Sequence, residues 1–174
     1  MAGKTQLATA GEQQAAIVIN NSFIDGLTKQ LEEKTKYGLS FPKDYNLSNA
    51  LMGAYLILKE TKDRNNKPIL ESCSQISIAN SLMNMATLGL SVQKKQGYFI
   101  SYGNQCQFQR SYFGNITIAR RYGMKDIHAE IIYDGDDFKY HIEDGNKVLD
   151  SHEQDFMNID NDKILGAYAV VQME

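Results

Sequence analysis

The 174-residue sequence has little cysteine and no long hydrophobic run. Cys73 and Cys106 are its two cysteines, and neither belongs to a C-x-x-C pair or has a histidine at metal-ligand spacing, so we expect neither a disulfide framework nor a structural zinc site. The sequence also lacks a run of about eighteen apolar residues and a cleavable signal pattern. We therefore expect reduced thiols in a soluble, cytoplasmic chain that has no membrane partner.

Acidic residues are absent from the middle of the chain. Residues 1–71 contain nine Lys/Arg and eight Asp/Glu, a net charge of +1. Residues 72–125 contain six Lys/Arg and no Asp/Glu, a net charge of +6. Residues 126–174 contain three Lys/Arg and thirteen Asp/Glu, a net charge of −10. The overall net charge of −3 argues against a nucleic-acid-binding protein, whereas the middle region favours a polyanion-binding face. Alternatively, residues 72–92 form a buried helix that carries no charge for reasons of packing. Such a helix would explain half of the length that lacks acidic residues.

The hydrophobic spacing predicts an α+β fold that begins with three helices, over about residues 21–36, 46–62 and 74–88. Gly89 is placed to end the third helix. The residues expected on the inward face of that helix are Ile76, Ala79, Met83 and Ala86.

A β-hairpin is expected next, with a tight turn at Gly103-Asn104. This turn pairs Phe99 with Phe108 and Ser101 with Cys106, which gives one apolar face. The opposite face carries Tyr98, Ile100, Tyr102, Gln105, Gln107 and Gln109. Such a face is too polar for a dry core and too aromatic for a plain solvent face, and it suits a wet binding surface. The alternative is a second layer that covers it and satisfies its amides through backbone groups.

A fourth helix is expected from Tyr112 to Tyr122, with Ile116 and Ala119 facing inward together with Tyr112. Its last turn holds Arg120 and Arg121. These two cations could bind an anionic ligand, or they could be present because cations stabilise the carboxyl end of a helix through its dipole. The remaining elements are two strands at 127–133 and 138–142 joined by the turn 134–137, a long acidic connection over 143–163, and a final strand at 165–172. We expect a flexible N-terminus at 1–19 and a single domain at 20–174, helical to about 90 and β-rich from about 91.

Several motifs in the second half resemble one known family. They are Leu88-Gly89-Leu90, Gln96 to Tyr102, Cys106 to Gln109, Tyr112, Gly114, Ala119 to Gly123, Ile127 to Ala129, Asp134 to Phe138, and Gly166 to Ala169. In order and spacing they resemble the RecT family of phage single-strand annealing proteins over about residues 75–174. The helices before this stretch match only in type.

The resemblance implies ATP-independent single-stranded DNA binding and annealing in phage-type homologous recombination and DNA repair, without an enzymatic site or a cofactor. It implies a RecT/Redβ-like annealing core that lines a narrow, positively charged groove, in a phage- or prophage-encoded protein of a bacterial host cell. The implied partners are single-stranded DNA, the annealed duplex intermediate, further copies in a ring or helical filament, a cognate exonuclease and a host single-strand-binding protein.

Candidate DNA-binding residues come from both lines of reasoning. The resemblance implies that five positions line the DNA groove: Gln107, Gln109, Tyr112, Arg120 and Arg121. The other candidates are added because their side chains are basic or aromatic. The full set is Lys94, Lys95, Tyr98, Tyr102, Gln107, Gln109, Arg110, Tyr112, Arg120, Arg121 and Lys125. The basic members suit phosphate contacts, and the tyrosines suit stacking against bases.

The chain departs from the family pattern in three places. Phe113 stands where the family commonly has lysine, so a basic contact is missing. Arg110 stands where an apolar residue is usual and could supply that charge, although a two-residue turn places it on the side of Phe99 and Phe108. The chain ends at Glu174, where the family continues through a further helix, so we expect a C-terminally truncated protein.

Two other functions are open at this point. A metal-dependent nuclease would gather magnesium on Asp134, Asp136 and Asp137 with Glu130 or Glu143, but a solvated hairpin turn is the simpler interpretation of these aspartates. A structural oligomer would dock the basic stretch of one protomer on the acidic 126–174 region of the next. The histidines are interpreted as ordinary strand or loop residues: His128, His141 and His152.

Overall fold

The computed structural model describes residues 19–174, which divide into two compact units. The first unit ends at Thr117 and the second is Ile118–Glu174, so the division falls inside one helix. Residues 1–18 of the predicted flexible N-terminus, which was expected over 1–19, lie outside the described residues. Ile19 is described and buried, and its backbone N–H donates to Gln75 Oε1 at 3.1 Å.

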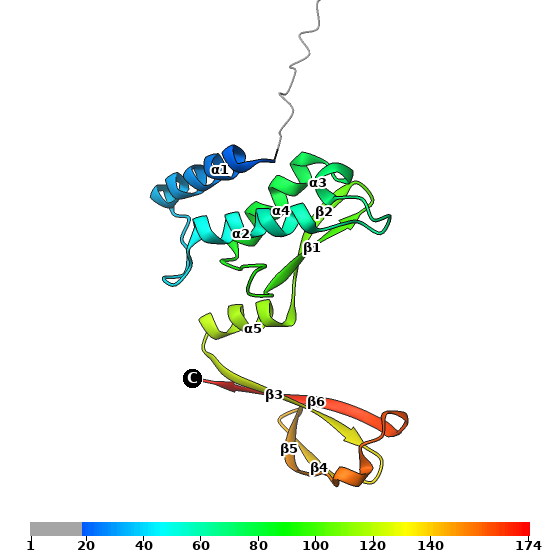
Figure 1. The fold of residues 1–174 in the computed structure, drawn as a ribbon. Helices are drawn as coiled ribbons and strands as arrows, with labels where there is room; N and C mark the ends of the chain where they lie inside the picture. The colour runs from blue at the N-terminus through cyan, green and yellow to red at the C-terminus, as the bar shows by residue number, and fades with distance from the viewer. Residues whose placement is uncertain (1–18) are drawn as a thin grey trace, which may run out of the picture. The chain divides into compact units, whose positions relative to one another are not determined.

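The first unit begins with the helices that the sequence predicts and adds a short one (Figure 1). They are α1 (Asn21–Lys34), the 3-10 helix η1 (Thr35–Tyr37), α2 (Leu47–Glu60), the additional α3 (Ile69–Ser72) and α4 (Gln75–Thr87). The side chains of Asn20, Asn46 and Ser74 each accept a hydrogen bond from the third residue after them and so cap α1, α2 and α4. Among the residues that the structure describes, no helix is long and apolar enough to cross a membrane.

The buried face of α4 agrees with the predicted one at Ala86 and differs from it at Ile76. Ile76 is 55% exposed, whereas Ile78 and Leu82 have no exposed area. The apolar period was misleading because the buried face also contains Ser77 and Ser81, whose hydroxyl groups bond to the backbone of the hairpin. A serine that is satisfied in this way is buried at little cost, and its polarity hides the true face from the pattern.

The hairpin has the predicted register. Strands β1 (Gly97–Tyr102) and β2 (Gln105–Arg110) pair Phe99 with Phe108, whose rings lie 5.8 Å apart. The outer edge of β2 is held by α4, because Cys106 N–H donates to Ser77 Oγ and Ser81 Oγ donates to Cys106 O, both at 2.9 Å. The apolar side of the hairpin is thereby buried in the first unit and its other side is turned outward.

Helix α5 (Tyr112–Arg121) follows the hairpin as predicted, but Tyr112 does not face inward. Its side chain is 57% exposed, and Gly114 is the buried residue of this helix. Tyr112 begins the first turn of α5, directly after Ser111, whose hydroxyl accepts from Gly114 N–H at 3.2 Å. In this turn it is Gly114 that packs against the loop before β1, because a β-carbon there would lie 2.0 Å from Gln96 O. The exposed position leaves its ring available for contacts with a ligand.

The second unit consists of two separate two-stranded antiparallel sheets. One pairs β3 (Met124–Tyr133) with β6 (Ile164–Met173), and the other pairs β4 (Asp137–Glu143) with β5 (Asn146–Glu153). Two 3-10 helices, η2 (Phe156–Asn158) and η3 (Asn161–Lys163), connect β5 to β6. The α+β class and the antiparallel strands agree with the prediction.

Two details of the predicted C-terminal part are wrong. The expected acidic connection contains β5, which has only two strongly apolar residues, Val148 and Leu149, and therefore a weak strand signal. The turn 134–137 does not join paired strands, because β3 and β4 belong to different sheets. The tight hairpin lies instead at Asp144-Gly145, where both φ angles are positive (48° and 80°), as a type I′ turn requires.

Candidate nucleic-acid interface

The outward side of the hairpin brings tyrosines and amides together. We call it the tyrosine–amide face; its members are Tyr98, Ile100, Tyr102, Gln105, Gln107 and Gln109. The register places Tyr98 opposite Gln109 and Tyr102 opposite Gln105. Tyr98 is 52% and Tyr102 44% exposed, so in the first unit this face is not covered by the second layer that was the alternative.

A hydrogen bond across the strands orders this face. Gln109 Nε2 donates to Tyr102 Oη at 2.6 Å, which fixes the phenol ring and leaves its plane open. Gln107 and Gln105 are exposed as well, and the amide of Gln105 donates to Asn104 Oδ1 at 3.2 Å. Exposed aromatic rings beside amides can stack on bases and accept or donate hydrogen bonds without reading a sequence.

The loop before β1 carries two of the candidate cations, Lys94 and Lys95, and both are exposed. Its position is set by Gln96, whose side chain accepts from Ser91 N–H at 2.9 Å and donates to Thr117 Oγ1 at 3.0 Å. Lys95 adopts a left-handed backbone conformation with φ of 55°, which its neighbours hold in place. The backbone that carries the two lysines is thus fixed at the entry to the hairpin.

The start of α5 lies against the same loop. Ser111 Oγ donates to Lys95 O at 2.6 Å, and Ser111 N–H donates to Gln96 O at 3.2 Å. These contacts bring Tyr112, at the first position of α5, next to the lysine loop. Sequence reasoning missed the positioning roles of Gln96 and Ser111, since a single glutamine or serine carries no periodic signal.

Arg110 lies at the end of β2 opposite Gly97, on the Phe99/Phe108 side that the register predicts. It is exposed there. The absence of a side chain at Gly97 is required, because a β-carbon on Gly97 would lie 2.3 Å from the ring of Phe108. Because Arg110 lies on the Phe99/Phe108 side of the hairpin, it is not a member of the tyrosine–amide face.

The remaining three candidates belong to the second unit. Arg120 and Arg121 form the last turn of α5 and Lys125 lies in β3, and all three are exposed. Eight of the eleven candidates thus lie in the first unit and three in the second. Cationic side chains at the carboxyl end of a helix are favoured by its dipole as well as by an anionic ligand.

The aspartates of the nuclease alternative do not gather. Asp136 is turned into the second unit with no exposed side-chain area, whereas Asp134 and Asp137 are exposed and Asp137 pairs with Lys139 at 2.6 Å. Within the described residues 19–174, no group of three or more His, Cys, Asp and Glu side chains could hold a metal ion. The interpretation of Asp136 as part of a solvated hairpin turn is wrong.

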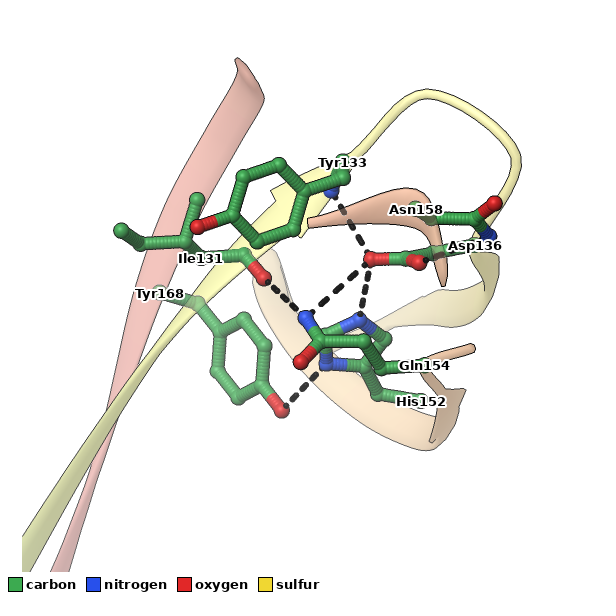
Figure 2. A network of polar contacts seen from close by, with 7 residues as sticks. All are labelled: Ile131, Tyr133, Asp136, His152, Gln154, Asn158 and Tyr168. Carbon is green, nitrogen blue, oxygen red and sulfur yellow. Dashed lines mark hydrogen bonds and ion pairs between the residues drawn. The ribbon is translucent and has the colours of Figure 1, made fainter. Parts of the chain in front are cut away.

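A hydrogen-bond network accounts for the burial of Asp136 (Figure 2). Its carboxylate accepts from Tyr133 N–H at 2.8 Å, His152 Nε2 at 3.2 Å, Gln154 Nε2 at 3.4 Å and Asn158 Nδ2 at 3.4 Å. The Tyr133 backbone N–H, followed by the three side chains, lowers the pKa of Asp136 below its ordinary value of 3.8. The network joins β3, β5 and the loop after β5.

His152 occupies the centre of this network. Its Nε2 lies 3.2 Å from the Asp136 carboxylate and its Nδ1 lies 3.1 Å from the hydroxyl of Tyr168, so the ring links these two side chains. Gln154 adds a bond to Ile131 O at 3.1 Å. The side chain of His152 is only 7% exposed, so this histidine is a buried structural residue, which its position in the sequence did not reveal.

A family model and a curated protein match this chain in sequence. The family model described as RecT family matches residues 48–174, which include the hairpin, α5 and all the described strands. A curated protein, the uncharacterized protein YqaK of Bacillus subtilis (strain 168), is 30% identical over 112 residues. That alignment covers 63% of this chain and 38% of YqaK, so the chain spans less than half the length of this relative.

Proposed function

The chain belongs to the RecT family, and from this premise we propose that it binds single-stranded DNA and anneals complementary strands without ATP in phage-type recombination and repair. Membership of the family implies single-strand annealing in recombination. The tyrosine–amide face is the observation that supports DNA binding by particular residues, because two tyrosine rings and three amides are exposed on this one side of the hairpin.

Annealing requires that one strand be held while its base edges stay free to test a second strand. Exposed cations hold phosphates without regard to sequence, and in this proposal Lys94 and Lys95, which are exposed in the loop before β1, supply such contacts. Tyr98 and Tyr102 support bases or sugars from one side, which leaves the edges open. Arg120, Arg121 and Lys125 supply further phosphate contacts from the second unit, and Arg110 and Tyr112 supply contacts from the ends of their elements.

The test compares tyrosine variants in oligo(dT) binding by fluorescence anisotropy. Tyr98→Ala is expected to weaken binding by about 1–3 kcal/mol, the contribution of one stacked base, and Tyr98→Phe should retain most of the affinity because it keeps the ring. Tyr37→Ala is the matched control, since Tyr37 is 88% exposed but lies in η1, outside the face. Equal affinities for Tyr98→Ala and Tyr37→Ala would remove the tyrosine–amide face from the proposal.

Annealing itself is measured by energy transfer between two complementary labelled oligonucleotides in the absence of ATP. The wild-type chain is expected to accelerate pairing, and Tyr98→Ala to lose acceleration in proportion to its lost affinity. Binding without any acceleration would reduce the proposed function to single-strand binding. The proposed place of action is the cytoplasm of a bacterial host, where the substrate DNA lies.

We also propose that copies of the chain assemble, as rings or helical filaments. The net charges of +6 over residues 72–125 and −10 over residues 126–174 allow the basic stretch of one copy to face the acidic region of the next. Light scattering with and without DNA tests this: assembly that weakens as salt rises supports it, and a monomer at all salt concentrations contradicts it. A cognate exonuclease and a host single-strand-binding protein are proposed as partners of the whole protein.

A further inference from the structure

A small pocket lies at the tip of the hairpin, beyond the end of the tyrosine–amide face. It has a volume of about 250 Å³ and is lined by Asp63, Arg64 and Asn65 of the connector between α2 and α3, and by Ser101, Tyr102 and Gly103 of the hairpin. Figure 1 shows the connector and the hairpin turn at the same end of the first unit. None of the candidate residues except Tyr102 belongs to this pocket.

The connector is an ordered loop. Asp63 Oδ1 accepts from Asn65 N–H at 2.8 Å and from Lys67 N–H at 2.9 Å, and Asp63 N–H donates to Lys67 O at 2.8 Å. The Lys67 N–H is the main reason why the pKa of Asp63 lies below its ordinary value. The carboxylate is thus engaged in shaping the loop, and Arg64 and Asn65 are exposed at its turn.

The hairpin side of the pocket is fixed as well. Asn104 O accepts from Ser74 N–H at 2.8 Å, which ties the hairpin turn to the start of α4. Tyr102 is held by its bond from Gln109. Both walls are therefore in place before a ligand binds, which lowers the entropic cost of binding.

The chemistry of the lining suits one nucleotide. The guanidinium of Arg64 is always charged and presents donors in a planar fork that matches a phosphate. Arg64 lines the pocket together with Tyr102, whose ring can stack on a base, and with Asn65, whose amide can bond to a base edge or a sugar. The connector adds Lys62 and Lys67 to Arg64, against the single carboxylate of Asp63. The local charge therefore favours an anionic ligand.

We propose that Arg64 and Asn65 form, with Tyr102, a further nucleotide subsite that takes the end of the bound single strand as it leaves the tyrosine–amide face. This subsite rests on the proposed single-strand binding. It extends the DNA path onto the connector, outside the acid-free stretch of residues 72–125 in which all the candidates lie. Arg64 binds a phosphate and Tyr102 supports the adjoining base.

The first experiment measures oligo(dT) affinity and its salt dependence for Arg64→Ala, with Lys29→Ala as the matched control, because Lys29 is an exposed cation of α1 in the same unit. Arg64→Ala is expected to weaken binding about tenfold, as loss of a charged hydrogen bond does, and to lower the slope of log K against log salt by about 0.7. Arg64→Lys should restore the salt slope but not the full affinity. Circular dichroism confirms that each variant is folded.

The second experiment locates the contact. Oligo(dT) with 5-iododeoxyuridine at one terminus is irradiated with the wild-type chain, and the cross-linked peptide is identified by mass spectrometry. Cross-linking from one terminus to Tyr102 or to the peptide that contains Asn65 supports the subsite.

The two proposals fail in different ways. If Tyr98→Ala weakens binding while Arg64→Ala equals Lys29→Ala, the subsite is wrong and single-strand binding stands. Cross-links from either terminus that never reach the connector or Tyr102 also overturn the subsite. If the wild-type chain does not bind oligo(dT) at all, both proposals fall together.

Discussion

The carbonyl oxygen of Gln96 occupies the space where a side chain on Gly114 would begin. A β-carbon on Gly114 would lie 2.0 Å from this oxygen, closer than any real contact of this kind. The approach lets α5 pack directly on the loop that carries Lys94 and Lys95, and the bond from Gln96 Nε2 to Thr117 secures it. One glycine therefore sets the position of the lysine loop relative to the start of α5.

Replacement of this glycine is expected to disturb both stability and binding. Gly114→Ala should destabilise the chain by about 1–3 kcal/mol, the usual cost of overpacking, because the new methyl group meets backbone rather than a flexible side chain. Oligo(dT) affinity should fall as well, because the lysine loop is displaced. Urea unfolding and anisotropy measure the two effects.

Gly26→Ala is the matched control for this change. A β-carbon on Gly26 has no atom within 4 Å, and alanine favours the helix by about 0.5–1 kcal/mol. This variant should therefore be slightly more stable than the wild type and bind DNA equally well. If Gly114→Ala unfolds at the same urea concentration as Gly26→Ala, the close approach does not constrain the fold.

The arginine pair at the end of α5 is expected to act through phosphates. In the double variant Arg120→Ala/Arg121→Ala, binding to oligo(dT) should weaken and the salt slope should fall by about 0.7 for each lost contact. Titrations at several salt concentrations measure both quantities. The double variant Lys34→Ala/Lys36→Ala removes an equal charge from the end of α1 and from η1 and should change neither by a comparable amount. An unchanged slope in the arginine variant would contradict the assignment.

The Asp136 network is expected to make stability depend on acid pH. Because the folded pKa of Asp136 lies below 3.8, its carboxylate stabilises the fold at neutral pH, and this stabilisation is lost as the pH falls through the folded pKa. Asp136→Asn should therefore be less stable than the wild type at pH 7, and its stability should decline less steeply as the pH falls below about 5. Urea unfolding at a series of pH values measures this decline.

Asp134→Asn is the control for the pH experiment, because Asp134 is an exposed aspartate of the same turn. Its pH profile should follow that of the wild type. Equal profiles for Asp136→Asn and the wild type would mean that the network of Figure 2 does not stabilise the folded state through this carboxylate.

Elements with local determinants were predictable. The register of the hairpin follows from the Gly103-Asn104 turn and the alternation of apolar residues, and the positions of α2 and α4 follow from their caps at Asn46 and Ser74. The candidate DNA residues were likewise found from charge, aromatic character and family pattern, and all of them are exposed. Whether they contact DNA stays a prediction.

The pairing of strands in the second unit was not predictable in the same way. In β3, His128 pairs with Val170 of β6, which lies far along the chain, and β4 pairs with β5 across a turn that the pattern did not single out. Alternating residues are compatible with several partners, so the choice depends on contacts between distant segments. The same holds for Ser77 and Ser81, which are buried only because the backbone of Cys106 lies opposite them.

The amino-acid sequence by itself determined the acid-free stretch, the α+β class and the register of the hairpin, because these depend on neighbours within a few residues. The exposure of the hairpin tyrosines was decided by the tertiary structure, which places no second layer over them in the first unit. Only the tertiary structure decided that Asp136 is buried, that Gly114 must lack a side chain, and that Arg64 and Tyr102 line one pocket. Each of these relationships joins residues that are distant in the chain. Its energy comes from groups that meet only after the elements have packed.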